Sequence, residues 1–413
     1  MGLARRDAGC DWAGDARMKS KSTKPDTLLA HAGRHPEQNH GVVNPPVYHA
    51  STILHPNVAD WEAAELRRLD DVVYGRFGTP TQFALEEAMA ALEGGARAVS
   101  VCSGAAACFT ALLAYLQAGD HVLVPDSVYG PVRAFTTGFL ARFGVAHDFY
   151  DPMIGAGIAA LIKPNTKVIY LESPGSLTFE VQDVPAIVAV AQARGITTML
   201  DNTWASPLFF RPLALGVDVS IVAGTKYVVG HSDAMMGLCI CTEASFEPVK
   251  RSAMQMGYHA APDDAYLALR GLRTAGVRMR AHQAAALRVA HWLKARPEVA
   301  QVLHPALPDC PGHEFWRRDF SGASGLFSIE LQRDYEKPAI DAMIDGMALF
   351  GLGASWGGFE SLMVPTKLAR LRTAAPWQGG PVLRLHIGLE DVDDLIADLE
   401  AGFARLNQGH SPA

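Results

Sequence analysis

Apolar and polar positions alternate in a regular order between about residue 79 and residue 265. Short runs rich in Val, Ile and Leu predict buried strands at residues 96–104, 120–126, 167–173, 196–202, 217–224 and 235–242. Several are separated by stretches with helical spacing, at residues 81–95, 105–119 and 184–195. This alternation predicts an α/β fold with a large, mainly parallel sheet and helices on both of its faces.

The pattern differs on either side of this region, and the chain divides into four predicted parts. Residues 1–25 have the composition of a disordered tail, and residues 26–78, rich in Pro, His and Asn, predict a mainly extended arm. Residues 79–270 make up the predicted α/β domain. Residues 271–413 continue a helical stretch interrupted by glycines, then show two strands and an amphipathic helix, so they predict a smaller α+β domain.

Composition argues against several classes of protein. Of 413 residues, 49% are apolar and 19% charged, and the net charge of -7 comes without a basic cluster outside the tail. This argues against a nucleic-acid partner, and no apolar run is long enough to span a membrane. The six cysteines form no CxxC pair and predict reduced thiols in a cytoplasmic protein. Neither they nor the histidines show metal-site spacing.

Four features follow strands of the predicted sheet, at the edge where such folds bind ligands. After Ser103, a helix begins with small residues from Gly104 onward, and its free N–H groups would suit an anion such as phosphate. Tyr129, Asp201 and Lys226 each follow a further strand. Taken singly, these features also fit a tight turn, a packed ring, a turn or cap, and a solvated lysine.

Together the four features predict a site for pyridoxal phosphate (PLP). This cofactor needs a lysine that forms a Schiff base with its aldehyde and an acidic group that pairs with its pyridinium nitrogen. It also needs a helix N-terminus for its phosphate. Lys226, Asp201 and Gly104 offer these three groups, and the Tyr129 ring lies at a fourth strand end.

Longer motifs resemble one family of such enzymes. Over about residues 26–405 the sequence is similar to the Cys/Met-metabolism PLP enzymes, on the stretches "YGRFGTPT", "SGAAA", "ESPGS", "DNTWASP", "GTKYVVGHSDAMMG", "RGLRTAGVRMRAH", "SWGGFESL" and "LRLHIGLED". The resemblance implies the aspartate aminotransferase-type fold, fold type I. "ESPGS", "GHSDAMMG" and "SWGGFESL" look most like the bacterial cystathionine β-lyase branch.

The resemblance implies a role for each residue at the strand ends. Lys226 would carry the cofactor and move the Cα proton of the substrate, while Asp201 would hold the pyridine nitrogen. Tyr129 would stack on the ring and is the second predicted catalytic residue. Gly104 and Ala105 would give backbone N–H groups to the phosphate.

Further cofactor contacts are implied outside these four strand ends. Thr225 would add its hydroxyl to the phosphate site. Tyr74 and Arg76 match a Tyr-x-Arg that reaches the phosphate of a neighbouring subunit in this family. The active protein is therefore expected to be at least a dimer, and the family's assembly implies a homotetramer made of two such dimers.

The substrate site is implied by the last two motifs. Arg384 would bind the substrate α-carboxylate with its planar guanidinium, and Ser355 and Trp356 lie in the matching substrate loop. Two residues depart from the family pattern: Phe77 stands where several lyases have a second arginine, and Ala354 stands where an aromatic residue is common. Both departures leave the selectivity for cystathionine open.

The expected activity is cleavage of the Cβ–S bond of L-cystathionine to homocysteine, pyruvate and ammonia, a carbon–sulfur lyase reaction of methionine biosynthesis and transsulfuration. Alternatives within the family are a cystathionine γ-lyase or γ-synthase and a broad cysteine-S-conjugate β-lyase. A non-catalytic PLP-binding regulatory protein is the alternative from another class.

The stretch His231–Asp233 contains the residue types of a hydrolase triad. Adjacent residues cannot adopt triad geometry, because a triad joins side chains from separate segments. We therefore expect these residues to form the turn after the Lys226 segment.

Overall fold

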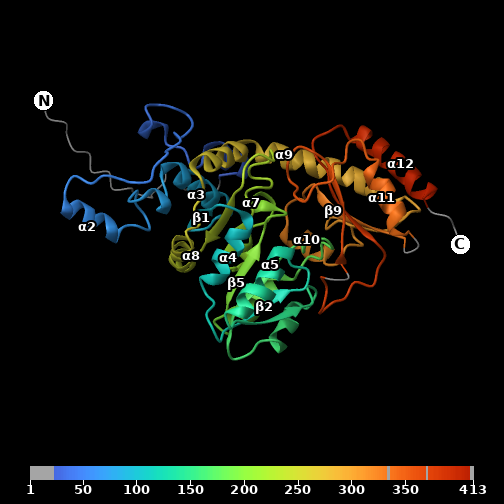
Figure 1. Ribbon diagram of the computed structural model, residues 1–413, viewed down its shortest axis with the longest axis horizontal. Helices are drawn as coiled ribbons and strands as arrows, with labels where there is room; N and C mark the ends of the chain where they lie inside the picture. The colour runs from blue at the N-terminus through green and yellow to red at the C-terminus, as the bar shows by residue number, and fades with distance from the viewer. Residues whose placement is uncertain (1–22, 333–334, 369–370, 410–413) are drawn as a thin grey trace.

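The computed structural model describes residues 23–332, 335–368 and 371–409, and a seven-stranded sheet forms its centre (Figure 1). The strand order is β1-β7-β6-β5-β4-β2-β3, and β7 runs antiparallel to both of its neighbours while the other pairs are parallel. The predicted large, mainly parallel sheet is therefore confirmed. Its strands are β1 Arg97–Val101, β2 His121–Pro125, β3 Ala146–Tyr150, β4 Thr166–Glu172, β5 Thr197–Asp201, β6 Val219–Val222 and β7 Gly237–Cys241.

Alternating side chains of each strand enter two different cores. In β7, Cys239 and Cys241 join the core on one face, and Leu238 and Ile240 join the core on the other. The first face is covered by α4 (Gly104–Leu113), α5 (Gly130–Ala134) and α8 (Glu243–Met256). The second is covered by α3 (Pro80–Glu93), α6 (Val184–Gln192) and α7 (Ser206–Phe209).

A second, smaller sheet follows in the carboxyl-terminal part of the chain. Its four antiparallel strands have the order β10-β11-β9-β8. They are β8 Val299–Leu303, β9 Leu326–Leu331, β10 Leu362–Pro365 and β11 Val382–His386. The accompanying helices are α10 His313–Asp319, α11 Lys337–Asp345 and α12 Val392–Gln408. Helices α11 and α12 share the core of this sheet, as an α+β arrangement requires (Figure 1).

One helix, α9, runs between the two parts of the molecule (Figure 1). It spans Pro262–Lys294, packs against α3 at its beginning, and enters the core of the small sheet at its end. The predicted interruptions at glycines are wrong, because the helix continues through Gly271 and Gly276. A Cβ on Gly271 would lie 2.4 Å from the carbonyl oxygen of Val228, so this glycine allows close packing. The predicted boundary after residue 270 lies within α9.

The arm at residues 26–78 contains more helix than the sequence pattern indicated. Helices α1 (Pro25–His31) and α2 (Val58–Leu66) form there, and the Asn57 side chain caps α2 by accepting a hydrogen bond from the Asp60 N–H. Leu66 is 89% exposed and α2 projects from the body (Figure 1). Most of the predicted tail, at residues 1–22, lies outside the described residues.

Short helical turns complete the fold. They are η1 Pro36–Gln38, η2 Gly75–Phe77, η3 Phe135–Leu140, η4 Gly155–Ala160 and η5 Pro212–Leu215. Within the described ranges, no helix has both the length and the apolar character needed to cross a bilayer.

Candidate active site

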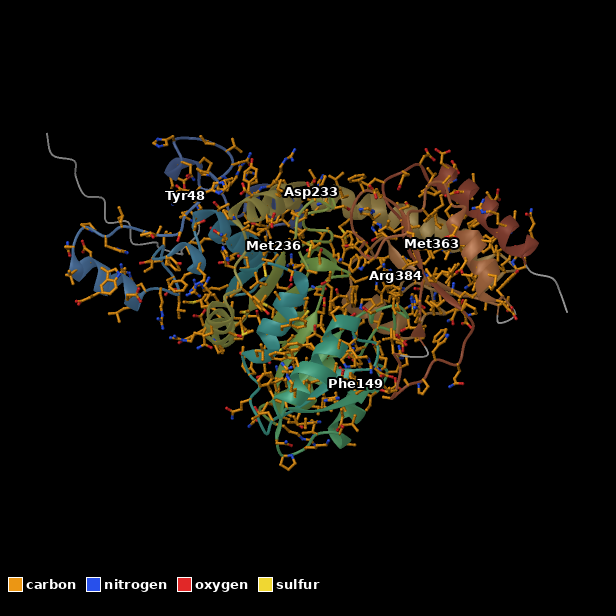
Figure 2. The ribbon with its side chains drawn as sticks, in the orientation of Figure 1. Tyr48, Phe149, Asp233, Met236, Met363 and Arg384 are labelled. Carbon is orange, nitrogen blue, oxygen red and sulfur yellow. The ribbon has the colours of Figure 1, made fainter. Side chains whose placement is uncertain are left out.

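A cavity of about 340 Å³ lies at the carboxyl ends of the central strands of the large sheet. Residues from the small-sheet part of the chain, including Leu326 and Leu371, close one side of it. The cavity brings together most of the residues that the sequence singled out: Gly104, Ala105, Tyr129, Asp201, Thr225, Lys226, Ala354, Trp356 and Arg384. Figure 2 shows Arg384 within the body of the molecule and Tyr48 away from it on the amino-terminal arm.

Lys226 follows β6 and points its amine at a loop from the small-sheet part. Its Nζ lies 2.7 Å from Ser355 Oγ and 5.3 Å from the centre of the Trp356 ring. Burial and, to a smaller extent, the Arg384 guanidinium lower the pKa of Lys226 to about 8, and Asp201 opposes the shift. The neutral amine, which is the nucleophile, is therefore reached well below the usual range for a lysine.

Asp201 ends β5 and presents a buried carboxylate to the same cavity. It accepts hydrogen bonds from the backbone N–H of Thr203 at 3.0 Å and from the Thr203 hydroxyl at 2.5 Å. Burial raises the pKa of Asp201, and the bonds from Thr203 oppose that shift. A buried carboxylate with these donors suits a cationic partner, such as a protonated ring nitrogen.

Glu172 is a second buried carboxyl group that the sequence reasoning left without a role. It ends β4 and is the register partner of Asp201. It accepts hydrogen bonds from the Tyr129 N–H at 2.7 Å and from the Ser176 hydroxyl at 2.6 Å, so it fixes the backbone that carries the Tyr129 ring. Burial and the nearby Asp201 raise its pKa. Its position at a strand end, like that of Asp201, was the signal available in the sequence.

The amino end of α4 lies at the cavity, where the sequence predicts an anion site. Ser103 accepts a hydrogen bond from the Ala106 N–H at 3.1 Å, and the N–H groups of Gly104 and Ala105 belong to the first turn, where no intrahelical partner exists. Both residues line the cavity. A Cβ on Gly104 would lie 2.4 Å from that of Ala223, so a larger residue would force α4 away from the β6 segment.

Thr225 lines the cavity, but its hydroxyl already has protein partners. It accepts a hydrogen bond from the Met236 N–H at 2.9 Å and lies 3.1 Å from the Met236 carbonyl oxygen. A bond from this hydroxyl to a phosphate would require its proton to turn away from that carbonyl.

Arg384 lies on β11 and reaches the cavity from the small sheet. Its Nη2 donates to the carbonyl oxygens of Ala354 and Ser355 at 3.1 and 3.2 Å, and burial lowers its pKa. The predicted carboxylate-binding arginine and the predicted substrate loop are therefore in direct contact. Trp356, the next residue of this loop, lines the cavity beside Lys226.

Tyr74 and Arg76 do not lie at this cavity in the described part of one chain. Tyr74 pairs with Thr52 in an isolated bridge, and Arg76 donates to the carbonyl oxygen of Met254. Phe77 packs edge-on to the Tyr74 ring at 5.6 Å. The expected contact of Tyr74 and Arg76 with a cofactor therefore stays a prediction that requires a second copy of the chain.

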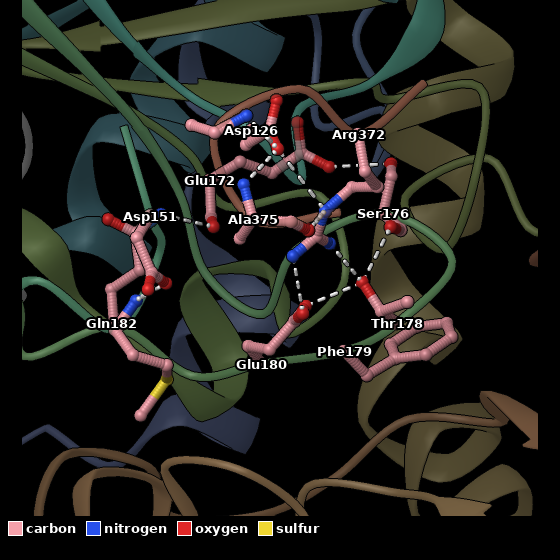
Figure 3. Close-up of polar contacts among 12 residues, drawn as sticks. Asp126, Asp151, Glu172, Ser176, Thr178, Phe179, Glu180, Gln182, Arg372 and Ala375 are labelled. Carbon is pink, nitrogen blue, oxygen red and sulfur yellow. Dashed lines mark hydrogen bonds and ion pairs between the residues drawn. The ribbon is translucent and has the colours of Figure 1, made fainter. Parts of the chain in front are cut away.

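A network of buried polar side chains holds the loop at residues 372–375 in place beside the cavity (Figure 3). Arg372 donates to Thr178 at 2.7 Å and to Glu180 at 2.9 Å. Asp126, directly after β2, accepts hydrogen bonds from the backbone N–H groups of residues 373–375 and pairs with Arg133. Burial would raise the pKa of Asp126, but these hydrogen bonds outweigh it and lower the pKa.

The stretch His231–Asp233 forms a turn, as expected. The His231 ring contacts the carbonyl oxygen of Val229 at 2.6 Å, and Ser232 has a positive φ of 58°. Among the described residues, no group of three or more His, Cys, Asp or Glu side chains is arranged to hold a metal ion.

The donor set of the cavity fits pyridoxal phosphate. Lys226 offers an amine with a lowered pKa, Asp201 a carboxylate, and Tyr129 an aromatic ring 39% exposed. The first turn of α4 offers N–H groups to a phosphate.

Comparison with known proteins identifies the family. The family model for the Cys/Met metabolism PLP-dependent enzymes matches residues 26–404. A putative cystathionine beta-lyase of Rhizobium johnstonii is 50% identical over 92% of this chain and 96% of its own length. Cystathionine beta-lyase MetC of Escherichia coli is 46% identical over 93% of this chain and 99% of its own.

A solved structure has the same fold. The cystathionine gamma synthase of Xanthomonas oryzae pv. oryzae, solved in complex with aminoacrylate and cysteine, is 31% identical. It superposes with a TM-score of 0.85 over 94% of this chain and 99% of that one. The chain therefore belongs to the family of Cys/Met metabolism PLP-dependent enzymes, and its cofactor is pyridoxal phosphate.

Proposed function

We propose that the protein is a carbon–sulfur β-lyase that cleaves L-cystathionine with water to homocysteine, pyruvate and ammonia. The observation that carries the proposal is the Lys226 amine, with a pKa lowered to about 8, in one cavity with Asp201 and Arg384. The two β-lyase-named relatives, at 50% and 46% identity, support β-cleavage over the γ-chemistry of the 31% identical synthase.

The residues divide the work of this reaction. The bound cofactor supplies an electron sink for the charge that develops at Cα when its proton leaves. Arg384 binds the α-carboxylate of the substrate and thereby orients the Cα–H bond. Lys226 takes that proton at Nζ, and Ser355, 2.7 Å away, orients the amine. Asp201 would pair with the ring nitrogen of the bound cofactor and favour its protonated form.

Tyr129 and Trp356 form apolar surfaces of the same cavity. Burial raises the pKa of the Tyr129 phenol, so its hydroxyl stays protonated at neutral pH and the ring packs as a neutral surface.

A broader β-lyase acting on cysteine S-conjugates is a second candidate. Ala354 lines the cavity, and its small side chain leaves room where a bulky distal group could lie. Comparing turnover of cystathionine with that of cystine separates the two candidates.

Identification of the keto acid tests the proposed reaction. Pyruvate formed from L-cystathionine supports β-cleavage, whereas 2-oxobutyrate would establish γ-cleavage instead. Bound PLP without turnover of any sulfur amino acid would favour a regulatory protein.

We also propose a homotetramer built from two dimers, with active sites shared between the two subunits of each dimer. The position of Tyr74 and Arg76 away from the cavity of their own chain supports this, as do the exposed Leu54, Trp61 and Leu66 on the arm. Light scattering tests the assembly, and an active monomer would contradict it.

We also propose a cytoplasmic location, because the buried cysteines are reduced thiols. Cys108, Cys239, Cys241 and Cys310 are free and buried, as suits a reducing compartment. Fractionation of cells that express the tagged protein tests the location.

A further inference from the structure

Strand β11 holds the substrate loop, residues 354–360, with a second side chain besides Arg384. His386 lies two residues farther along, on the same side of the strand, and is buried. Its Nε2 lies 3.1 Å from the backbone nitrogen of Gly357, and its Nδ1 lies 3.0 Å from the carbonyl oxygen of Glu360.

These two contacts determine the protonation of the ring. The Gly357 N–H can only donate, so Nε2 must be the acceptor, and the ring proton therefore lies on Nδ1 and is donated to Glu360. Burial, together with the neighbouring His282, Arg384 and Lys226, lowers the pKa of His386 to about 3, although the contact with Glu360 opposes the shift. The neutral ring thus satisfies one donor and one acceptor of the loop.

The loop in turn lies directly against Lys226. Gly357 has a φ of +86°, and a Cβ at this position would lie 3.0 Å from Lys226 Cα, so the backbone of the loop touches the backbone of the lysine. A Cβ on its neighbour Gly358 would lie 2.1 Å from the Ser232 hydroxyl oxygen. Any shift at Gly357 would therefore also displace Ser355, whose hydroxyl contacts the lysine amine.

We propose that His386 is a positioning residue of the active site, because its two ring nitrogens fix residues 357–360 and so place Ser355 and Trp356 against the Lys226 amine. The inference rests on the proposed function only for its kinetic consequence. Its structural content, the coupling of the His386 ring to this loop, is independent of the substrate.

Two variants and one matched control test the proposal in the PLP-loaded enzyme. His386→Phe keeps a planar ring and removes both nitrogens, whereas His386→Gln places an amide oxygen within reach of the Gly357 N–H. His121→Phe is the control, because His121 is also fully buried and bonded, to Thr166, but lies at the amino end of β2, away from the cavity lining.

Hydrogen–deuterium exchange of the peptide covering residues 354–361 is the readout independent of activity. In His386→Phe we expect exchange of this peptide to rise about fivefold or more, as loss of a hydrogen bond of ordinary strength allows. We also expect kcat/KM for cystathionine to fall about 10- to 100-fold. His386→Gln should recover part of both, and His121→Phe should change neither.

The proposal would be overturned if loop exchange in His386→Phe equalled that of wild type. It would also be overturned if loop exchange rose as much in His121→Phe as in His386→Phe. If His386→Phe does not fold, His386→Gln decides: loop exchange faster than in wild type and in His121→Phe supports the proposal, and loop exchange equal to that of wild type refutes it. A wild-type enzyme without lyase turnover, but with loop exchange controlled by His386, would refute only the β-lyase function.

Discussion

The amine of Lys226 lies 2.7 Å from the hydroxyl of Ser355, although 129 positions separate the two residues in the chain. The lysine follows a strand of the large sheet, and the serine belongs to a loop held by a strand of the small sheet. The reacting amine is thus carried by the large sheet and oriented by a loop that the small sheet holds.

Replacing the amine should abolish catalysis. In Lys226→Ala we expect cystathionine turnover to fall at least about 1000-fold, because both the nucleophile and the base are lost. The visible absorbance of the lysine-bound cofactor should disappear as well. Lys163→Ala is the control, since Lys163 is an exposed lysine paired with Asp148, and it should retain full turnover.

The two buried carboxyl groups should have separable roles. Asp201→Asn removes the charge beside the ring nitrogen, and we expect kcat to fall about 100-fold or more. Glu172→Gln keeps the shape of the side chain that holds the Tyr129 backbone, so we expect a smaller fall in kcat than in Asp201→Asn. Steady-state kinetics of both variants checks the order, and an equal loss in the two would show that Asp201 has no special electrostatic role.

Capture of the cofactor should depend on pH. Only the neutral amine reacts, so the rate at which cofactor-free protein binds PLP covalently should rise with pH and level off above about 8. Arg384→Gln removes a cation that disfavours the ammonium form, so its midpoint should move upward. Stopped-flow absorbance measures the rates, and a wild-type midpoint near 10.5 would show an unperturbed lysine.

The Arg372 network should contribute strongly to stability. The Arg372 side chain is 5% exposed and the Glu180 side chain 9% exposed, so Arg372→Gln leaves the buried charge of Glu180 without its partner. We expect the free energy of unfolding to fall by about 3–5 kcal/mol. Urea unfolding measures this change.

A double-mutant cycle with Glu180→Gln isolates the pair, and its coupling should exceed that of the exposed Lys337–Asp341 pair, expected at about 0.5 kcal/mol. Equal coupling in the two pairs would contradict the role of the network.

Local signals explain which residues the sequence could predict. Asp201, Lys226 and Gly104 each stand directly after an apolar run, so their positions at one edge of the sheet followed from the strand pattern. Arg384, Ser355 and Trp356 were accessible only through resemblance to known motifs.

Long-range partners explain what could not be predicted. Arg372 bonds to Glu180 across 192 positions, and His386 contacts a loop 29 positions earlier whose conformation depends on a glycine pressed against Lys226. The unbroken α9 was missed because the cost of glycine within a helix is outweighed by close packing at Gly271.

Helix α9 has a mechanical consequence. A helix of 33 residues extends about 50 Å, and this one is anchored in the core around Leu269 and again in the core around Leu293. Because one continuous helix is packed into both cores, it resists a hinge motion of the two sheets relative to each other. Closure around a substrate must then come from loop movement, and small-angle scattering curves with and without a substrate analogue should superpose.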